Sequence, residues 1–133
     1  MSTDHPPCSA PPQRCCDPLL IAIAVAGFLG VALGAFGAHA LNERLVANDR
    51  LDVWQTAVLY HLVQVVAALA VLGLSRAAAV WWLAGVAVFS GSLYLLAITN
   101  IGGFGAITPI GGVAFLVGWV LLIPAAIRSA HSR

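Results

Sequence analysis

The chain has 133 residues, of which 61% are hydrophobic and 8% are charged, and its mean hydropathy is +0.97. A soluble domain carries about 25% charged residues, and a chain this short has too little interior to hide so much apolar surface from water. The composition therefore excludes an ordinary soluble domain and indicates a lipid bilayer as the main partner. The formal net charge is only +1 and no basic run occurs, so nucleic acid is not an expected partner.

The first part of the chain differs in composition from the rest. Residues 1–18 contain five of the seven prolines and all three cysteines. Such a segment has too few large apolar residues to offset the entropy of ordering, so we predict a disordered tail over 1–18. Cys8, Cys15 and Cys16 have neither C-x-x-C nor Cys/His ligand spacing, and we interpret them as exposed, reduced thiols. No metal site and no other cofactor is expected.

The first apolar run extends from Leu19 to Ala38 without a charged residue. At 1.5 Å per residue, a helix of this length crosses the roughly 30 Å hydrocarbon core of a bilayer. Ala38-His39-Ala40 resembles a signal-peptidase site, but the apolar region of a signal peptide has about 7–15 residues, and this run is longer. We therefore interpret the run as a membrane span.

Small residues recur every four positions in this first span, which places them on one helix face. In lipid, such a face lets two backbones approach closely and gain dispersion contacts. The third and fourth spans carry further small residues, so helix packing is predicted at Ala26, Gly30, Gly34, Ala38, Gly91 and Gly118. The sequence leaves open whether the partner helix belongs to this chain or to a second copy.

Two later segments carry signals for helix starts. Residues 42–52 are polar and are predicted to form a loop, at whose end Asp52 followed by Gln55 resembles a capping box. Thr108 followed by Pro109 predicts another start, with a side-chain cap and then proline at the first helical position.

Together these signals predict an all-α protein, an integral membrane four-helix bundle with a disordered N-terminal tail. Helices fit better than strands because every span is long and lacks the polar alternation of a membrane barrel. The membrane domain is predicted over 19–127, with spans at about 19–41, 53–74, 77–99 and 109–127, followed by a short basic tail at 128–133.

The chain has four tryptophans, whose amphipathic rings favour the membrane–water interface. Trp54, Trp81 and Trp82 lie near the starts of spans and are predicted to be interfacial anchors. Trp119 lies deeper in its span and is predicted to pack inside the bundle.

Arginines near the span ends predict the orientation, because cytoplasmic loops are richer in Lys and Arg. The tails and the second loop share one side of the membrane and carry more arginines than the other two loops: Arg14, Arg76, Arg128 and Arg133 against Arg44 and Arg50. We therefore predict a multi-pass protein with both termini in the cytoplasm. The small excess leaves dual insertion open.

Polar side chains gather toward the outer half of the expected bundle. The candidates for one polar cluster are His39, Tyr60, His61, Gln64, Tyr94, Thr99 and Asn100. Polar groups in a membrane tend to face the bundle interior, and the simplest interpretation is hydrogen bonding between helices. A small binding site or a proton-sensitive element is the alternative. We also expect His39 to tie the end of the first span, through one of its last carbonyls or through a neighbouring span.

Four runs in the spans are similar to a known family when taken together and in order. They are LGAFGAHAL (33–41), WQTAVLYH (54–61), FSGSLYLLA (89–97) and ITPIGGVAFLVGW (107–119). They resemble the YgdD-like domain-of-unknown-function family (DUF423) of small membrane proteins, over roughly residues 20–127. The resemblance implies a four-helix integral membrane protein without an established activity. One departure is that family members usually carry His where Gln64 stands, whereas this chain has His61 one turn earlier.

The sequence favours a role without catalysis. Neither G-x-S-x-G nor H-E-x-x-H occurs, and no nucleophile–base pair is evident, so an enzyme is not expected. We predict a non-enzymatic protein of the bacterial inner (plasma) membrane, of unknown biochemical role, which packs with copies of itself or with another membrane protein. The alternative is a small transporter or ligand-binding membrane protein that uses the polar cluster. The position of all five acids outside the predicted spans argues against proton-coupled export.

Overall fold

The computed structural model describes residues 17–131, so most of the predicted tail and all three cysteines lie outside the described residues. The described part is helical apart from its connections and contains no strand. Four of its helical segments are long and apolar enough to cross a membrane. The predicted all-α four-helix membrane bundle is therefore confirmed.

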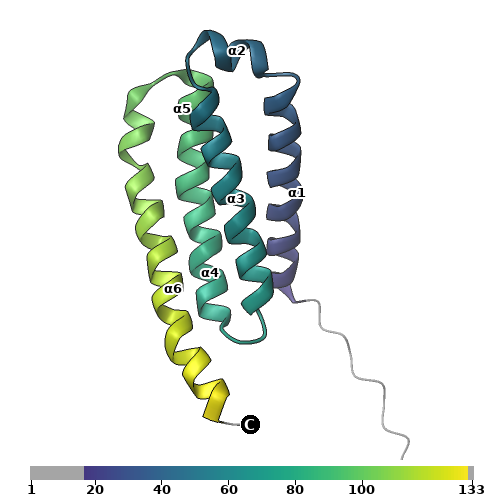
Figure 1. The fold of residues 1–133 in the computed structure, drawn as a ribbon, viewed down its shortest axis with the longest axis vertical. Helices are drawn as coiled ribbons and strands as arrows, with labels where there is room; N and C mark the ends of the chain where they lie inside the picture. The colour runs from purple at the N-terminus through teal and green to yellow at the C-terminus, as the bar shows by residue number, and fades with distance from the viewer. Residues whose placement is uncertain (1–16, 132–133) are drawn as a thin grey trace, which may run out of the picture.

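The spans follow one another with short connections (Figure 1). A π-helix interrupts the third span, and the connections carry a short α-helix and a 3₁₀-helix. In chain order the elements are α1 (Pro18–Ala38), α2 (Asn42–Ala47), α3 (Leu51–Val71), α4 (Arg76–Gly85), the π-helix η1 (Val86–Ser90), α5 (Gly91–Thr99), the 3₁₀-helix η2 (Gly102–Ala106) and α6 (Thr108–His131).

The four spans form an open, flattened bundle. α1 packs along α3, α3 packs along α4, η1 and α5, and α6 packs along α4 and η1. α1 and α6 lie on opposite flanks and, within the described residues, do not pack against each other (Figure 1). We call the end that carries α2 the α2 end. The opposite end, where α1 begins and α3 turns into α4, is called the Asp17 end.

Two apolar clusters form the core. One lies toward the Asp17 end and includes Trp82 and Phe115, while the other lies at the α2 end and includes Leu45 and Trp54. Buried residues of α3 belong to both clusters, and His61 lies between them along that helix. His61, the single histidine of α3, therefore lies near the middle of the helix, between the two apolar clusters.

The segment 42–52 was predicted to be a loop, and this prediction is wrong because residues Asn42–Ala47 form α2. The helix is held by Leu45, which is only 1% exposed and packs against the α2-end cluster. Asp52 does not cap α3 either. That helix begins at Leu51, and its N-cap residue, Arg50, makes no capping bond.

The start and end of α6 also differ from expectation. Thr108 does begin the helix, but its hydroxyl lies 2.8 Å from the Ser92 hydroxyl of α5 and so links two spans. Pro124 lies inside the helix, which continues to His131 and so takes in much of the segment expected as a tail at 128–133. Alanines on both sides of Ile127 favour helix there, and Ala125 is buried.

The tryptophans are placed differently from the predicted anchors. Trp54 and Trp82 are buried, at 2% and 0% exposure, so the prediction that they sit at the interface is wrong. Trp119 is 46% exposed, and its ring packs on the Trp82 ring at 4.7 Å between centroids. Trp81 is 44% exposed. The two buried rings have partners for their N–H groups, as described below.

Candidate functional site

His61 links three helices near the middle of the bundle. Its Nε2 lies 2.9 Å from the Ala26 carbonyl oxygen of α1, and its Nδ1 lies 3.3 Å from the Tyr94 hydroxyl of α5. A carbonyl oxygen can only accept, so Nε2 carries the proton. In the neutral ring Nδ1 is then an acceptor, and the Tyr94 hydroxyl donates to it. A directed chain of hydrogen bonds therefore runs from α5 through α3 to α1.

Gly30 makes this contact possible. In an α-helix a side chain covers the surface one turn toward the N-terminus, so a side chain at position 30 would cover the Ala26 carbonyl. A Cβ added to Gly30 would stand 3.2 Å from Cδ2 of His61 and 2.7 Å from Cδ2 of Leu62. The glycine therefore exposes a backbone carbonyl that the imidazole of a neighbouring helix can reach.

The same arrangement occurs twice more in the bundle, with indole rings. Trp54 donates from Nε1 to the Leu33 carbonyl at 3.2 Å, and a Cβ at Gly37 would overlap this indole. We call each such set of ring, carbonyl and glycine a ring seat. Within the described residues the three seats are His61/Ala26/Gly30, Trp54/Leu33/Gly37 and Trp82/Phe115/Gly118, the last with a 3.2 Å hydrogen bond from Nε1.

The remaining residues expected to pack helices behave differently from one another. A Cβ at Gly34 would stand 3.3 Å from Cγ1 of Val58, which is a close approach between α1 and α3. Ala38 is exposed at the end of α1. Gly91 does not pack, because no atom of another segment lies within 4 Å of the place where its Cβ would stand.

Sequence analysis missed the closest backbone approach. A Cβ at Gly111 in α6 would overlap the backbone nitrogen of Phe89 in η1 and stand 2.7 Å from its Cα. Gly111 and Gly118 are seven residues apart, which places them on one face of α6. This seven-residue spacing of glycines was the sequence signal that could have predicted a close helix approach.

The predicted polar cluster is not a single cluster. The structure brings His61 and Tyr94 together, but Tyr60 lies elsewhere and packs its ring on Phe89 at 4.9 Å. Gln64 is 6% exposed, and its Oε1 has no partner among the described residues.

The other candidates lie at the α2 end. Thr99 donates to the Leu95 carbonyl at 2.6 Å, and Asn100 accepts from Arg50 at 2.8 Å. The ring of His39 is exposed and makes no hydrogen bond among the described residues, so the expected tie is not formed there. The last turn of α1 is held instead by the Asn42 amide, which donates to the Ala38 carbonyl at 3.4 Å, and by the Trp54 ring seat.

A cleft of about 310 Å³ opens beside His61, between α1 on one side and α4, η1 and α5 on the other. Its walls are apolar, and His61 and Tyr94 supply the polar side chains of its lining. Gly91 borders the cleft, which explains the empty space beside it. Within the described residues no three His, Cys, Asp or Glu side chains come together to hold a metal ion.

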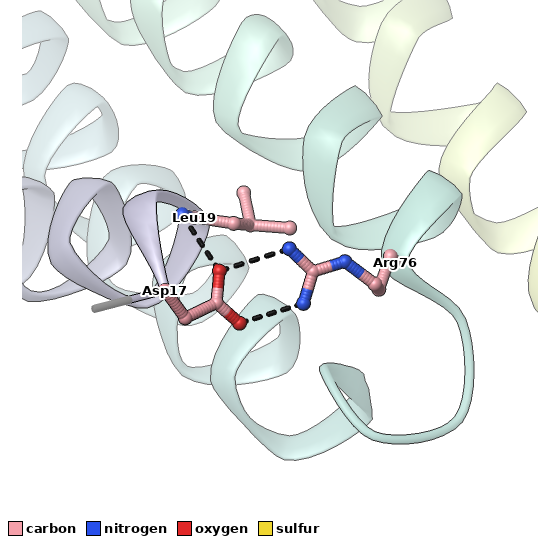
Figure 2. Close-up of polar contacts among 3 residues, drawn as sticks. All are labelled: Asp17, Leu19 and Arg76. Atoms are coloured by element: carbon pink, nitrogen blue, oxygen red, sulfur yellow. Dashed lines mark hydrogen bonds and ion pairs between the residues drawn. The ribbon is translucent and has the colours of Figure 1, made fainter. Parts of the chain in front are cut away.

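At the Asp17 end an ion pair joins two spans, and sequence analysis did not identify it (Figure 2). Asp17 caps α1 by accepting from the Leu19 amide at 3.0 Å, and it forms two bonds of 2.6 and 2.9 Å with the guanidinium of Arg76. The Arg76 hydrogen bonds lower the pKa of Asp17 from 3.8 to about 2. The start of α1 is thus fastened to the start of α4.

Comparison with known proteins places this chain in a family. Residues 33–112 match the family described as "Protein of unknown function (DUF423)". The "UPF0382 membrane protein YwdK" of Bacillus subtilis is 44% identical over 114 residues, which cover 79% of this chain and 92% of the relative. The "UPF0382 inner membrane protein YgdD" of Escherichia coli K12 is 41% identical over 121 residues, which cover 83% and 89%. No solved structure matches. The chain therefore belongs to the DUF423 family of membrane proteins, whose function is unknown, as the resemblance implied.

Proposed function

We propose that this membrane protein is non-catalytic and acts by contact with other chains within the membrane. The observation that carries the proposal is that the polar side chains that link the spans, His61 first among them, are bonded to the protein's own atoms. Both ring nitrogens of His61 have protein partners, and the hydroxyl of Ser92 meets that of Thr108. A general base or nucleophile needs a lone pair or proton free for the substrate, so these groups are poorly suited to chemistry.

The positions of the acids support the same proposal. Among the described residues, the carboxylates lie at the ends of the spans or in the connections: Asp17, Glu43, Asp49 and Asp52. Proton-coupled transport needs a titratable group along a path through the membrane. His61 is the one histidine inside a span of the described chain, and its two hydrogen bonds hold it in place.

α1 is the helix best placed to meet a partner. It packs along α3 and contacts α2 and α4 only briefly, so most of its surface is open. Phe28 is 73% exposed and Val31 is 64% exposed. We propose that this face of α1 contacts a second copy or another membrane protein.

A photo-reactive phenylalanine analogue at position 28 tests this role in native membranes. We expect an adduct with a second protein chain from position 28. The matched control is the same analogue at Val120 of α6, which is 62% exposed on the other flank and should give lipid adducts only. If position 28 gave lipid adducts alone, the proposed contact role would be refuted.

We further propose that the Asp17 end faces the cytoplasm, with both termini on that side. Among the described residues Arg76 and Arg128 belong to this end, and Arg44 and Arg50 belong to the α2 end. At the α2 end the arginines have a structural use, because Arg44 donates to the Ile98 carbonyl and Arg50 to the Asn100 side chain. Both bonds satisfy acceptors at or just beyond the C-terminus of α5, where cations are favoured.

A further inference from the structure

The cleft beside His61 has the size of a small-molecule site. Its volume of about 310 Å³ lies at the lower end of the roughly 300–1,000 Å³ that ligand pockets occupy. A transmembrane helix is about 10 Å wide and needs more room than this. An apolar chain or a small ring system fits between Leu29 of α1 and Val86 of η1.

Gly91 indicates that the cleft is kept open. Its backbone angles are φ −59° and ψ −46°, so no unusual conformation requires glycine there. No neighbouring atom within 4 Å requires it either. Glycine inside a helix costs about 1 kcal/mol relative to alanine. Here the absence of a side chain has one structural effect, which is to leave space in the cleft.

The π-helix that lines the cleft is a second feature that is energetically unfavourable. Such segments are rare in proteins and are frequent at functional sites. Ser90, its last residue, is 0% exposed, and its hydroxyl has no partner among the described residues.

The polar side chains of the lining define the ligand. Tyr94 donates its proton to His61, so the Tyr94 oxygen can accept a hydrogen bond but has no proton left to give. The residues that line the cleft include no acid and no arginine. A charged group bound there would lack a partner in the membrane interior, which is strongly unfavourable. The matching ligand is neutral and carries one hydrogen-bond donor.

We propose that the cleft between α1 and η1 binds a neutral, lipid-soluble alcohol. Its apolar body lies between the two helices, and its hydroxyl donates to the Tyr94 oxygen. This binding site goes beyond the contact role of α1 and does not depend on it.

A clickable, diazirine-bearing long-chain alcohol tests the proposal on the full-length protein in lipid nanodiscs. The matched probe is the carboxylic acid with the same photo-reactive chain. Mass spectrometry of the labelled peptides reports whether residues of the cleft react. We expect the alcohol to label cleft peptides at least about five times more than the acid does at about pH 9, where the acid is ionised and would bury an unpaired charge.

Two glycine variants separate binding in the cleft from contact with surrounding lipid. Gly91→Leu extends a side chain into the cleft from a position where an added Cβ meets no atom within 4 Å. Gly73→Leu adds the same side chain away from the cleft, at a position whose Cβ is equally unobstructed. We expect Gly91→Leu to abolish the cleft label and Gly73→Leu to keep it. Equal labelling of the two variants would overturn the proposal.

The hydroxyl contact has its own test. Tyr94→Phe keeps the ring and removes the accepting oxygen, and it should reduce labelling by the alcohol about threefold to tenfold, as for one lost hydrogen bond. The melting temperature of each variant is measured in parallel, so that Gly91→Leu decides the question if Tyr94→Phe does not fold. Labelling of the folded Tyr94→Phe variant at the wild-type level would refute the assigned hydroxyl contact.

Discussion

A ring N–H inside a bilayer finds no water, and an unsatisfied polar group there is costly. The backbone carbonyls of neighbouring helices are the acceptors at hand, although each already accepts a bond within its own helix. In each of the three ring seats, the ring N–H reaches such a carbonyl because a glycine stands where a side chain would block the approach. Glycine in this bundle thus serves hydrogen bonding as well as close packing.

The seat of Trp82 gives a direct test at the residue scale. Gly118→Ala places a Cβ where it overlaps the indole, so either the ring or the helix must move. We expect the free energy of unfolding to fall by about 1–3 kcal/mol, as is usual for overpacked positions. Thermal unfolding in mild detergent measures the change.

Gly112→Ala is the matched control for this variant in the same helix. A Cβ there would meet Cδ2 of Phe89 at 3.9 Å, which is an ordinary contact. This variant should be as stable as the wild type or more so, because alanine favours helix. If both variants lost the same stability, the seat would not be the cause.

At the scale of elements, the spans could be predicted from sequence because their length and apolarity follow directly from the thickness of a bilayer. α2 could not, because six residues are too few for a stable isolated helix and its formation depends on burying Leu45 against other elements. The π-helix Val86–Ser90 has no local signature either, since an apolar run is compatible with both helix types.

The candidate site was predicted only in part, for a related reason. His61 and Tyr94 were both among the candidates, and helix geometry separates Tyr60 from its neighbour His61, but the sequence did not show that Tyr60 meets Phe89 and that His61 meets Tyr94. The rotation and register between helices decide which side chains meet. The rotation and register depend on which ring of one helix packs over which glycine of another, as His61 packs over Gly30. The sequence of a single span does not contain that information.

The ion pair that fastens α1 to α4 gives a prediction with a defined pH dependence. Arg76 lowers the pKa of Asp17 in the folded protein to about 2, so the pair stabilises the fold fully above the unfolded value of 3.8. This stabilisation is lost as the pH falls toward 2. We expect Arg76→Gln to melt at a slightly lower temperature than the wild type at pH 6, and the difference to be much smaller at pH 2, where half of the folded-state carboxylate is protonated.

Melting curves of both proteins at pH 6, 4 and 2 measure this effect. Arg128→Gln removes a cation from another element and is the matched control. Its difference from the wild type should not follow the titration of Asp17. A deficit of Arg76→Gln that persisted unchanged at pH 2 would show that the arginine acts through something other than the ion pair.

At the scale of the whole molecule, the proposed orientation is tested by reporter fusions. A reporter active only in the cytoplasm, placed after Arg133, should be active, and the same reporter inserted between Ala47 and Leu51 should be silent. A reporter active only outside the cytoplasm should give the reverse pattern. Activity of both reporters at both positions would indicate dual insertion, and an external C-terminus would refute the orientation.

The open, flattened shape determines how much each span depends on its surroundings. Only 11% of the α1 span is buried inside the protein, against 44% of the span formed by α4, η1 and α5. Most of α1 is therefore covered by its surroundings in the membrane, which are lipid tails and the partner chain proposed above. Solubilisation replaces those neighbours, and helices in lipid lack a hydrophobic force that would hold them together. The choice of detergent consequently matters most for α1, whose main anchors are its contact with α3, which includes two ring seats, and the Asp17–Arg76 pair.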